Sequence, residues 1–221
     1  MGTESVVEIN ALGEHGEVLP ESRLSAACGT ARRTVRTRAR GRAYEQGVLI
    51  SDWQAGRVQI ESLAGHHRLA PLLGAWHHSE WGHLYPSEVW NAEIATAEFE
   101  AMASSTSADR TWIAFDGETR RAEDVLGSVS LMASDDLAGY EHLTPWLASM
   151  FVAPAARGRG VASALGDHLL AAATDAGHGE VYLFTSGQDD FWSARGWRVI
   201  AEVETAGSPA IVMSRSTRSA Q

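Results

Sequence analysis

Lysine is absent from this 221-residue sequence, and cysteine occurs once, at Cys28. A single cysteine excludes an internal disulfide and any zinc or iron–sulfur site that needs several thiolates. No apolar run approaches the roughly eighteen residues that a membrane-spanning helix requires. Residues 1–6 also lack the basic flank and apolar stretch of a secretory signal. We therefore expect a cytoplasmic protein that has no membrane partner.

The charge of the sequence is unbalanced. All 18 basic residues are Arg, and 28 acidic residues bring the formal net charge to −10. Residues 1–46 hold seven Arg and six Glu, so the acidic excess lies in the remainder of the chain. Such an acidic body repels phosphate backbones and attracts amines. Nucleic acid is therefore not expected as the main ligand, whereas a cationic or amine-bearing substrate would be drawn toward this body.

The first 46 residues show little hydrophobic periodicity and contain a cluster of arginines. A segment of this kind buries too little apolar area to offset its conformational entropy. We expect a disordered, Arg-containing extension over residues 1–46, a single domain over 47–215 and a short tail over 216–221. The alternative is an arginine arm that binds nucleic acid or an acidic surface.

Regular hydrophobic patterns begin near residue 48. The alternation at residues 57–63 predicts a half-buried strand, and the spacing of apolar residues over 67–81 predicts a helix. A second helix is expected to begin at Ser87, as its N-cap, and to run through Phe99. Two further helices are predicted at residues 161–176 and 191–195, and further strands at residues 111–115, 125–133, 145–152, 181–185, 197–204 and 210–214. This order predicts one α/β domain with a mixed sheet.

The most informative segment is Val152–Ser163, where a buried strand, a tight turn and the clearest helix follow one another. Free backbone N–H groups and the positive end of the helix dipole converge at such a turn. Gly158 and Gly160 carry no Cβ, so an anion can approach the main chain closely. Arg157 and Arg159 add positive charge. A diphosphate is the ligand that suits this turn best.

Two nucleotide-binding patterns compete for this turn. Gly158–Ser163 comes close to the dinucleotide pattern G-x-G-x-x-[GA], which needs an acidic residue at the end of the next strand. That strand closes instead with residues 184–186, Phe-Thr-Ser, and no second βαβ half follows. The other pattern, [RQ]-x-x-G-x-[GA], is met by Arg157, Gly160 and Ala162.

Together with Val152-x-Pro154 before it, this second pattern resembles the coenzyme A pyrophosphate loop of the GNAT N-acetyltransferase superfamily. Residues 191–197 are similar to the F-Y-x-x-x-G-F segment of the same family, and the resemblance covers about residues 58–214. It implies a GNAT-like α/β fold, in which helices flank a mixed, mostly antiparallel central sheet with a splayed cleft at the central strand. It also implies acetyl-CoA as co-substrate.

The resemblance assigns roles to the central strand and the turn. A pantetheine arm would pair with the strand backbone, a main-chain N–H near Met150 or Phe151 would bind the acetyl carbonyl, and the acceptor amine would attack directly. The implied cofactor-binding residues are Met150, Phe151, Val152, Arg157, Gly158, Arg159, Gly160, Val161, Ala162 and Ser163.

The catalytic acid and base are less well defined by the sequence. Trp192 stands where the family commonly has a Tyr that protonates the departing thiolate, and an indole N–H is not a useful acid at neutral pH. The alternatives are that water or Ser193 gives this proton to the thiolate, or that the reaction needs no acid. For the general base, two polar regions, 77–83 and 135–142, border the acceptor side, and we favour Glu80 or His142.

No metal is expected in the histidine-rich stretch 75–83. His77 and His78 have Trp81 and Gly82 four residues later, so neither forms an i, i+4 ligand pair. The resemblance implies an N-acetyltransferase that acts on a primary amine of a small molecule, a peptide or a protein N-terminus, and we expect a monomer or homodimer. The alternative is a catalytically inactive acyl-CoA-binding regulatory module.

Overall fold

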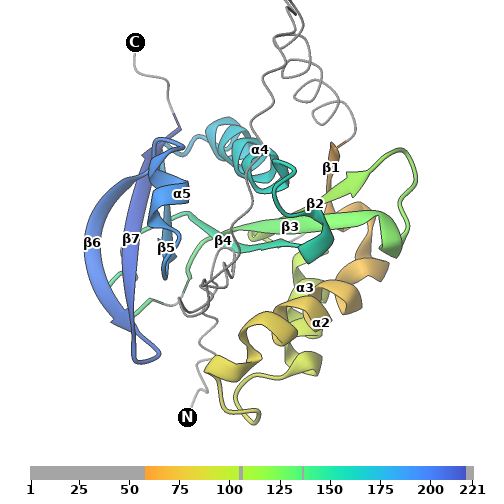
Figure 1. Ribbon diagram of the computed structural model, residues 1–221, viewed down its shortest axis with the longest axis horizontal. Coiled ribbons are helices and arrows are strands. Elements are labelled where there is room, and N and C mark those ends of the chain that lie inside the picture. Colours follow the sequence, from red (N-terminus) through yellow and green to blue (C-terminus); the bar gives the residue numbers. More distant parts are fainter. Residues whose placement is uncertain (1–57, 105–106, 136, 218–221) are drawn as a thin grey trace, which may run out of the picture.

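A computed structural model describes residues 58–104, 107–135 and 137–217. The extension expected at 1–46, Asp136 of the second polar region and most of the expected tail lie outside these residues. The described chain forms a seven-stranded sheet in the order β1-β2-β3-β4-β5-β7-β6 (Figure 1). Its strands are β1 (Val58–Ser62), β2 (Arg110–Asp116), β3 (Val125–Met132), β4 (Trp146–Val152), β5 (Glu180–Thr185), β6 (Arg198–Thr205) and β7 (Ser208–Ser216).

Helices cover both faces of this sheet. The α-helices are α2 (Ala70–Trp81), α3 (Ala92–Met102), α4 (Val161–Asp175) and α5 (Asp189–Ser193). Short 3₁₀ turns lie at Leu63–Gly65, His67–Leu69, Gly82–Leu84, Ala122–Asp124 and Pro154–Ala156. In Figure 1, α2 and α3 lie side by side on one side of the sheet and α4 lies on the other. The predicted order of strands and helices is confirmed. No described helix has the length and apolar character needed to cross a membrane.

The alternation of β2 explains the two layers. Trp112 and Ala114 pack into the core with α4, whereas Ile113 and Phe115 pack with α2 and α3. Successive side chains of a strand point to opposite faces, so one central strand contributes to both cores. An apolar run without a polar face is what a strand covered on both sides requires.

Helix α3 begins later than the sequence pattern indicates. Its N-cap is Asn91, whose Oδ1 accepts a hydrogen bond from the Ile94 N–H at 3.0 Å. The prediction that Ser87 caps this helix was therefore wrong, because residues 87–90 form a turn. Trp90 in this turn is buried, and its indole N–H donates to Glu98. Asn is at least as good an N-cap as Ser, so tertiary burial of Trp90 decided between two acceptable caps.

The central strand β4 carries a bulge. Ser128 of β3 pairs with Phe151 and Ser130 pairs with Ala148, so Val129 faces two residues of β4, Ser149 and Met150. Ser149 has a φ of +53°, in the left-handed region that non-glycine residues rarely adopt. Bulges bend a strand and re-aim its backbone groups, often beside active sites.

The same strand separates from its neighbour on the other side. Strands β4 and β5 are the only parallel neighbours in the described sheet, and their register contains a single pair, Trp146 with Tyr182. The Tyr182 N–H also donates to the Pro145 carbonyl at 3.0 Å. Beyond this point the two strands diverge, which confirms the mostly antiparallel sheet and the cleft expected at the central strand.

Candidate active site

The turn between β4 and α4 owes its shape to two glycines. Gly158 has a φ of +72° and Gly160, the N-cap of α4, has a φ of +79°. A Cβ added at either position would meet no atom within 4 Å. Glycine is therefore favoured here by the backbone conformation rather than by crowding. The space above both residues is open to a ligand.

The beginning of α4 faces a cleft of about 330 Å³. Gly160 has no side chain to cap the helix, so the first N–H groups of α4 and the positive end of its dipole face this cleft. Several predicted cofactor residues line the cleft together. These are Val152, Arg157, Gly158, Gly160, Val161, Ala162 and Ser163, and they are joined by Ala156, Gln188, Phe191 and Arg195.

Arg157 is anchored at the edge of the cleft. Its Nε donates to the Val152 carbonyl at 3.2 Å, and its Nη2 lies 3.7 Å from Oε2 of Glu80. Glu80 comes from the last turn of α2, so this ion pair connects that helix to the turn before α4. The structure thus places the predicted base Glu80 beside the turn, as the partner of a cation.

Arg159 points elsewhere. Its Nη2 lies 2.9 Å from Oδ2 of Asp116 at the end of β2, and its side chain lines a separate depression on the far side of the turn. Only its backbone belongs to the turn that borders the cleft. The sequence shows that two arginines lie near the turn, but it does not show which way each side chain points.

Arg195 is the functional candidate that sequence reasoning missed. It follows α5, lines the cleft, and its Nε donates to Oγ of Ser163 at 2.9 Å. Its Nη1 donates to the Phe191 carbonyl, and its guanidinium carbon lies 3.6 Å from the centroid of the Phe191 ring. The only sequence signal was a basic residue inside the segment 191–197, more than thirty residues from the turn.

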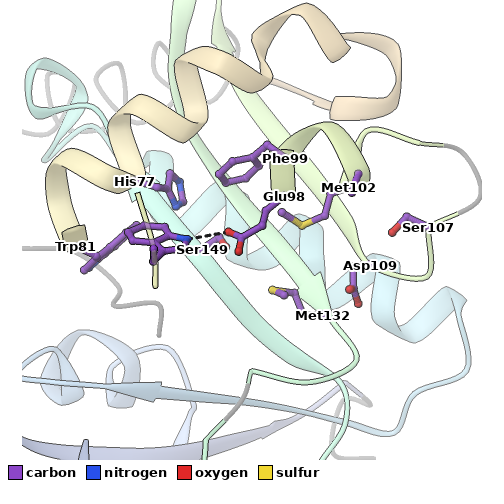
Figure 2. A pocket seen from close by; sticks show the side chains of 11 residues that line it. His77, Trp81, Glu98, Phe99, Met102, Ser107, Asp109, Met132 and Ser149 are labelled. Carbon is purple, nitrogen blue, oxygen red and sulfur yellow. Dashed lines mark hydrogen bonds between the residues drawn. The ribbon is translucent and has the colours of Figure 1, made fainter. Parts of the chain in front are cut away.

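A second cavity, of about 200 Å³, lies on the face covered by α2 and α3. It reaches the bulge of β4 at Ser149, next to the backbone expected to hold the acetyl group. Its walls are mostly aromatic and aliphatic, with two carboxylates among them (Figure 2). The lining residues are His77, Trp81, Trp90, Glu98, Phe99, Ala101, Met102, Ser107, Asp109, Met132 and Ser149.

His77 is the most deeply buried polar side chain of this second cavity after Ser149. It is 2% exposed, and burial lowers its pKa from 6.5 to about 3 because the apolar surroundings disfavour the charged imidazolium. Its ring packs edge-on against Trp81 and Phe99, and its Nε2 lies 3.3 Å from Oγ of Ser128. At neutral pH, His77 is therefore an uncharged imidazole and a weak base.

The two carboxylates of the second cavity are held by hydrogen bonds. The indole N–H of Trp90 donates to Oε2 of Glu98 at 3.0 Å, and the Ala133 N–H donates to Oδ1 of Asp109 at 2.8 Å. Figure 2 shows Glu98 projecting from α3 into the cavity, with its bond to the Trp90 indole as a dashed line.

The sequence matches the model of the acetyltransferase (GNAT) family over residues 72–195, more than half of the chain. The chain belongs to the GNAT family. It is therefore an acetyltransferase. The matched segment contains most of α2, all of α3, α4 and α5, the bulged strand and the turn before α4. A search of curated protein sequences finds no match.

Solved structures share the GNAT fold of this chain. A GCN5-related N-acetyltransferase from Kribbella flavida is 25% identical, with a TM-score of 0.55 over 73% of this chain and 99% of that one. An aminoglycoside 6'-N-acetyltransferase complexed with coenzyme A is 13% identical, with a TM-score of 0.56 over 74% and 99% of the two chains. Spermidine N-acetyltransferase from Vibrio cholerae, in complex with CoA and spermine, is 14% identical, with a TM-score of 0.53 over 73% and 96%.

Trp192, which the resemblance aligned with a GNAT tyrosine, lies in the core of this chain. Its side chain is 1% exposed, packs against the Trp197 ring at a centroid distance of 5.4 Å, and lines neither cavity. Within the described residues its buried indole N–H has no hydrogen-bond partner. A side chain so placed is a packing residue rather than a proton donor to a ligand.

The other predicted base, His142, also lies away from both cavities. It is exposed in the loop between β3 and β4, where its ring stacks on Tyr140 at a centroid distance of 6.2 Å. Across residues 58–104, 107–135 and 137–217, no group of three or more His, Cys, Asp or Glu side chains is arranged to hold a metal ion.

Proposed function

We propose that this GNAT acetyltransferase moves the acetyl group of acetyl-CoA to a primary amine by direct attack. The observation that carries the proposal is the combination of an uncapped N-terminus of α4 with a bulged β4 that diverges from β5. The first feature suits a diphosphate, and the second exposes strand backbone to an extended chain. Coenzyme A contains both groups in one molecule.

The diphosphate is proposed to bind on the backbone N–H groups from Gly158 to Ser163. Oriented amides and the helix dipole favour the anion, and the Arg157 guanidinium at the cleft edge adds a charge-assisted contact. The proposed set consists of Arg157, Gly158, Arg159, Gly160, Val161, Ala162 and Ser163, with Arg159 contributing its backbone. Glu80 is proposed to orient Arg157 through their ion pair.

The pantetheine arm is proposed to run along the backbone of Met150, Phe151 and Val152. An N–H at Met150 or Phe151 then stabilises the negative charge that develops on the acetyl oxygen. The coenzyme A thiolate is a fair leaving group, so the reaction proceeds without a proton from Trp192. Structures of an aminoglycoside 6'-N-acetyltransferase and of a spermidine N-acetyltransferase with coenzyme A support this choice of carrier.

The acceptor is proposed to enter from the α2 and α3 face, through the second cavity. In this proposal the amine approaches the acetyl carbon beside the bulge of β4 and attacks it without a covalent enzyme intermediate. The primary amine of a small molecule, a peptide or a protein N-terminus fits this route. The cytoplasmic location and the monomeric or homodimeric state stay predictions.

The proposal is tested by measuring free thiol released from acetyl-CoA in the presence of a panel of primary amines. We expect amine-dependent release by the full chain and none by Gly160→Asp, which would place a carboxylate against the diphosphate. Tight binding of acetyl-CoA by calorimetry, without release for any amine, would instead support the acyl-CoA-binding regulatory module. Failure to bind acetyl-CoA would contradict both functions.

A further inference from the structure

We propose that the cavity between α3 and the bulge of β4 binds a compact primary amine with an apolar body, and that Glu98 holds its ammonium group and accepts its proton. Arylalkylamines and alkylamines of similar size belong to this class. The inference rests on the proposed function and specifies its acceptor. It follows from the size, the walls and the charges of one cavity.

The size of the cavity limits the acceptor. An engineered apolar cavity of about 150 Å³ is filled by benzene. A cavity of about 200 Å³ therefore accepts a ring with a short chain, or an alkyl chain of comparable size. Drug-sized ligands occupy pockets of about 300–1,000 Å³. A multi-ring amino sugar thus exceeds the volume of this cavity.

The walls of the cavity favour an apolar body. Trp81 and Phe99 present ring surfaces, and Met102 and Met132 present flexible thioethers that adapt to a ligand of varied shape (Figure 2). Several hydroxyl groups, or more ammonium groups than the two carboxylates of the cavity can pair, would lose their water here without matching partners, which costs free energy for each group buried. Polyamines and sugars are disfavoured for this reason.

The charges of the cavity favour a cation at one end. Glu98 and Asp109 are carboxylates, and no Arg lines this cavity among the described residues. An amine that carries its own carboxylate, such as an amino acid, meets two like charges instead.

Glu98 is better suited than His77 to accept the proton. Burial keeps His77 uncharged, and its ring nitrogen lies within hydrogen-bond distance of Ser128 on the sheet side of the cavity. Glu98 projects into the cavity, and the Trp90 indole fixes the position of its carboxylate. The carboxylate is therefore pre-oriented, which lowers the entropy cost of binding an ammonium group.

The reaction balances with this assignment. The ammonium gives one proton to Glu98, and the neutral nitrogen forms a bond to the acetyl carbon while the carbon–sulfur bond breaks. The second proton lost from nitrogen neutralises the departing thiolate. The products are the N-acetyl amine, free coenzyme A and a proton that Glu98 passes to water.

The first test compares amines that differ in one group. Phenethylamine and phenylalanine differ by a carboxylate, so we expect kcat/KM, measured by thiol release, to be at least about 100-fold higher for phenethylamine. Spermidine and kanamycin serve as polar polyamines and should also be poor acceptors. Equal values for phenethylamine and phenylalanine, or preference for spermidine or kanamycin, would overturn the inference while the proposed function stands. No release with any amine would overturn both.

The second test changes the proposed base. Glu98→Gln can still accept the hydrogen bond from Trp90, so the fold should persist, but it cannot take up a proton. We expect kcat/KM for phenethylamine to fall at least about 100-fold, with unchanged acetyl-CoA affinity by calorimetry. Glu100→Gln, an exposed position on the same helix, is the matched control. Equal kcat/KM for Glu98→Gln and the control would show that Glu98 is not the base.

Discussion

The guanidinium of Arg195 donates from its Nε to Oγ of Ser163 at 2.9 Å. Ser163 lies in the first turn of α4 and Arg195 follows α5, so this bond connects two segments separated by β5. Both residues line the cleft at the beginning of α4. Arg195 therefore adds a second guanidinium to the cleft that Arg157 also lines.

Arg195→Ala should weaken coenzyme A binding by about 1–3 kcal/mol, because it removes a charged group at the cleft and frees Ser163 and Phe191 from their contacts. Isothermal calorimetry with coenzyme A measures this directly. Arg198→Ala, an exposed residue that pairs with Glu180, is the control and should leave the affinity unchanged. Equal coenzyme A affinity in both variants would show that Arg195 does not contribute to binding.

Arg157→Ala should cost about 1–3 kcal/mol in coenzyme A affinity, the usual scale of a charge-assisted contact. The loss should shrink at high salt, because the interaction is partly exposed to solvent. Titrations at two ionic strengths check both statements. The exposed Arg121 provides a matched Arg→Ala control. An Arg157→Ala variant with wild-type affinity would show that the guanidinium does not contact the ligand.

Gly160→Asp should abolish coenzyme A binding, because the added carboxylate faces the diphosphate and the side chain occupies open space above the turn. Gly177→Asp is the control. Gly177 also has a positive φ, +88°, with no atom within 4 Å of a Cβ, but it lies beyond the other end of α4. Gly177→Asp should lose more stability than Gly160→Asp in thermal unfolding, because a carboxylate is unfavourable at the C-terminal end of a helix dipole, but only Gly160→Asp should lose binding. Retained affinity in a folded Gly160→Asp protein would refute the assignment of the turn.

His77 should make the protein less stable in acid. The folded pKa of about 3 lies below the unfolded value of 6.5, so below pH 6.5 the unfolded state binds a proton that the folded state does not. The free energy of unfolding should therefore fall by up to about 1.4 kcal/mol per pH unit as the pH drops from 6.5 towards 3. As the pH rises above 6.5, the unfolded histidine also loses its proton and this pH dependence disappears.

Chemical denaturation between pH 4 and pH 8 tests this behaviour. His77→Gln should show a shallower decline than the wild-type protein, even if its stability at pH 8 is lower. His142→Gln, at an exposed histidine, should keep the wild-type slope. Identical slopes for wild-type and His77→Gln would show that His77 titrates normally in the folded state.

Trp192→Tyr should not increase kcat, because residue 192 is buried against Trp197 and lines neither cavity. The smaller ring leaves space in the core, so the main effect should be a loss of stability of about 1–3 kcal/mol. Steady-state kinetics and thermal unfolding of the same variant separate the two effects. A tenfold or greater gain in kcat would show that a tyrosine here reaches the leaving thiolate.

The order of strands and helices could be predicted from the sequence because each element carries its own periodicity. The tight turn at Arg157–Ala162 could also be predicted from the sequence, because its glycines and the helix that follows it set the local backbone geometry. The start of α3 was misplaced because Ser87 and Asn91 are both acceptable caps, and only the burial of Trp90 selects between them.

Residues from distant segments were the ones that sequence reasoning missed or left ambiguous. Arg195 and Glu98 carry no local pattern that distinguishes them from solvent-exposed charges, yet one lines the cleft at α4 and the other projects into the second cavity. Arg159 was grouped with Arg157 by proximity, but its side chain pairs with Asp116 across the turn.

The sequence by itself determined the family, the layered fold and the glycine turn before α4, because backbone conformation and hydrophobic period are encoded in neighbouring residues. Only the tertiary structure decided which side chains converge on each cavity, that His77 is buried without its charge and that Trp192 belongs to the core. Those properties depend on packing between segments far apart in the chain. Packing decides which way each side chain points, and the exclusion of solvent decides whether a titratable side chain carries its charge.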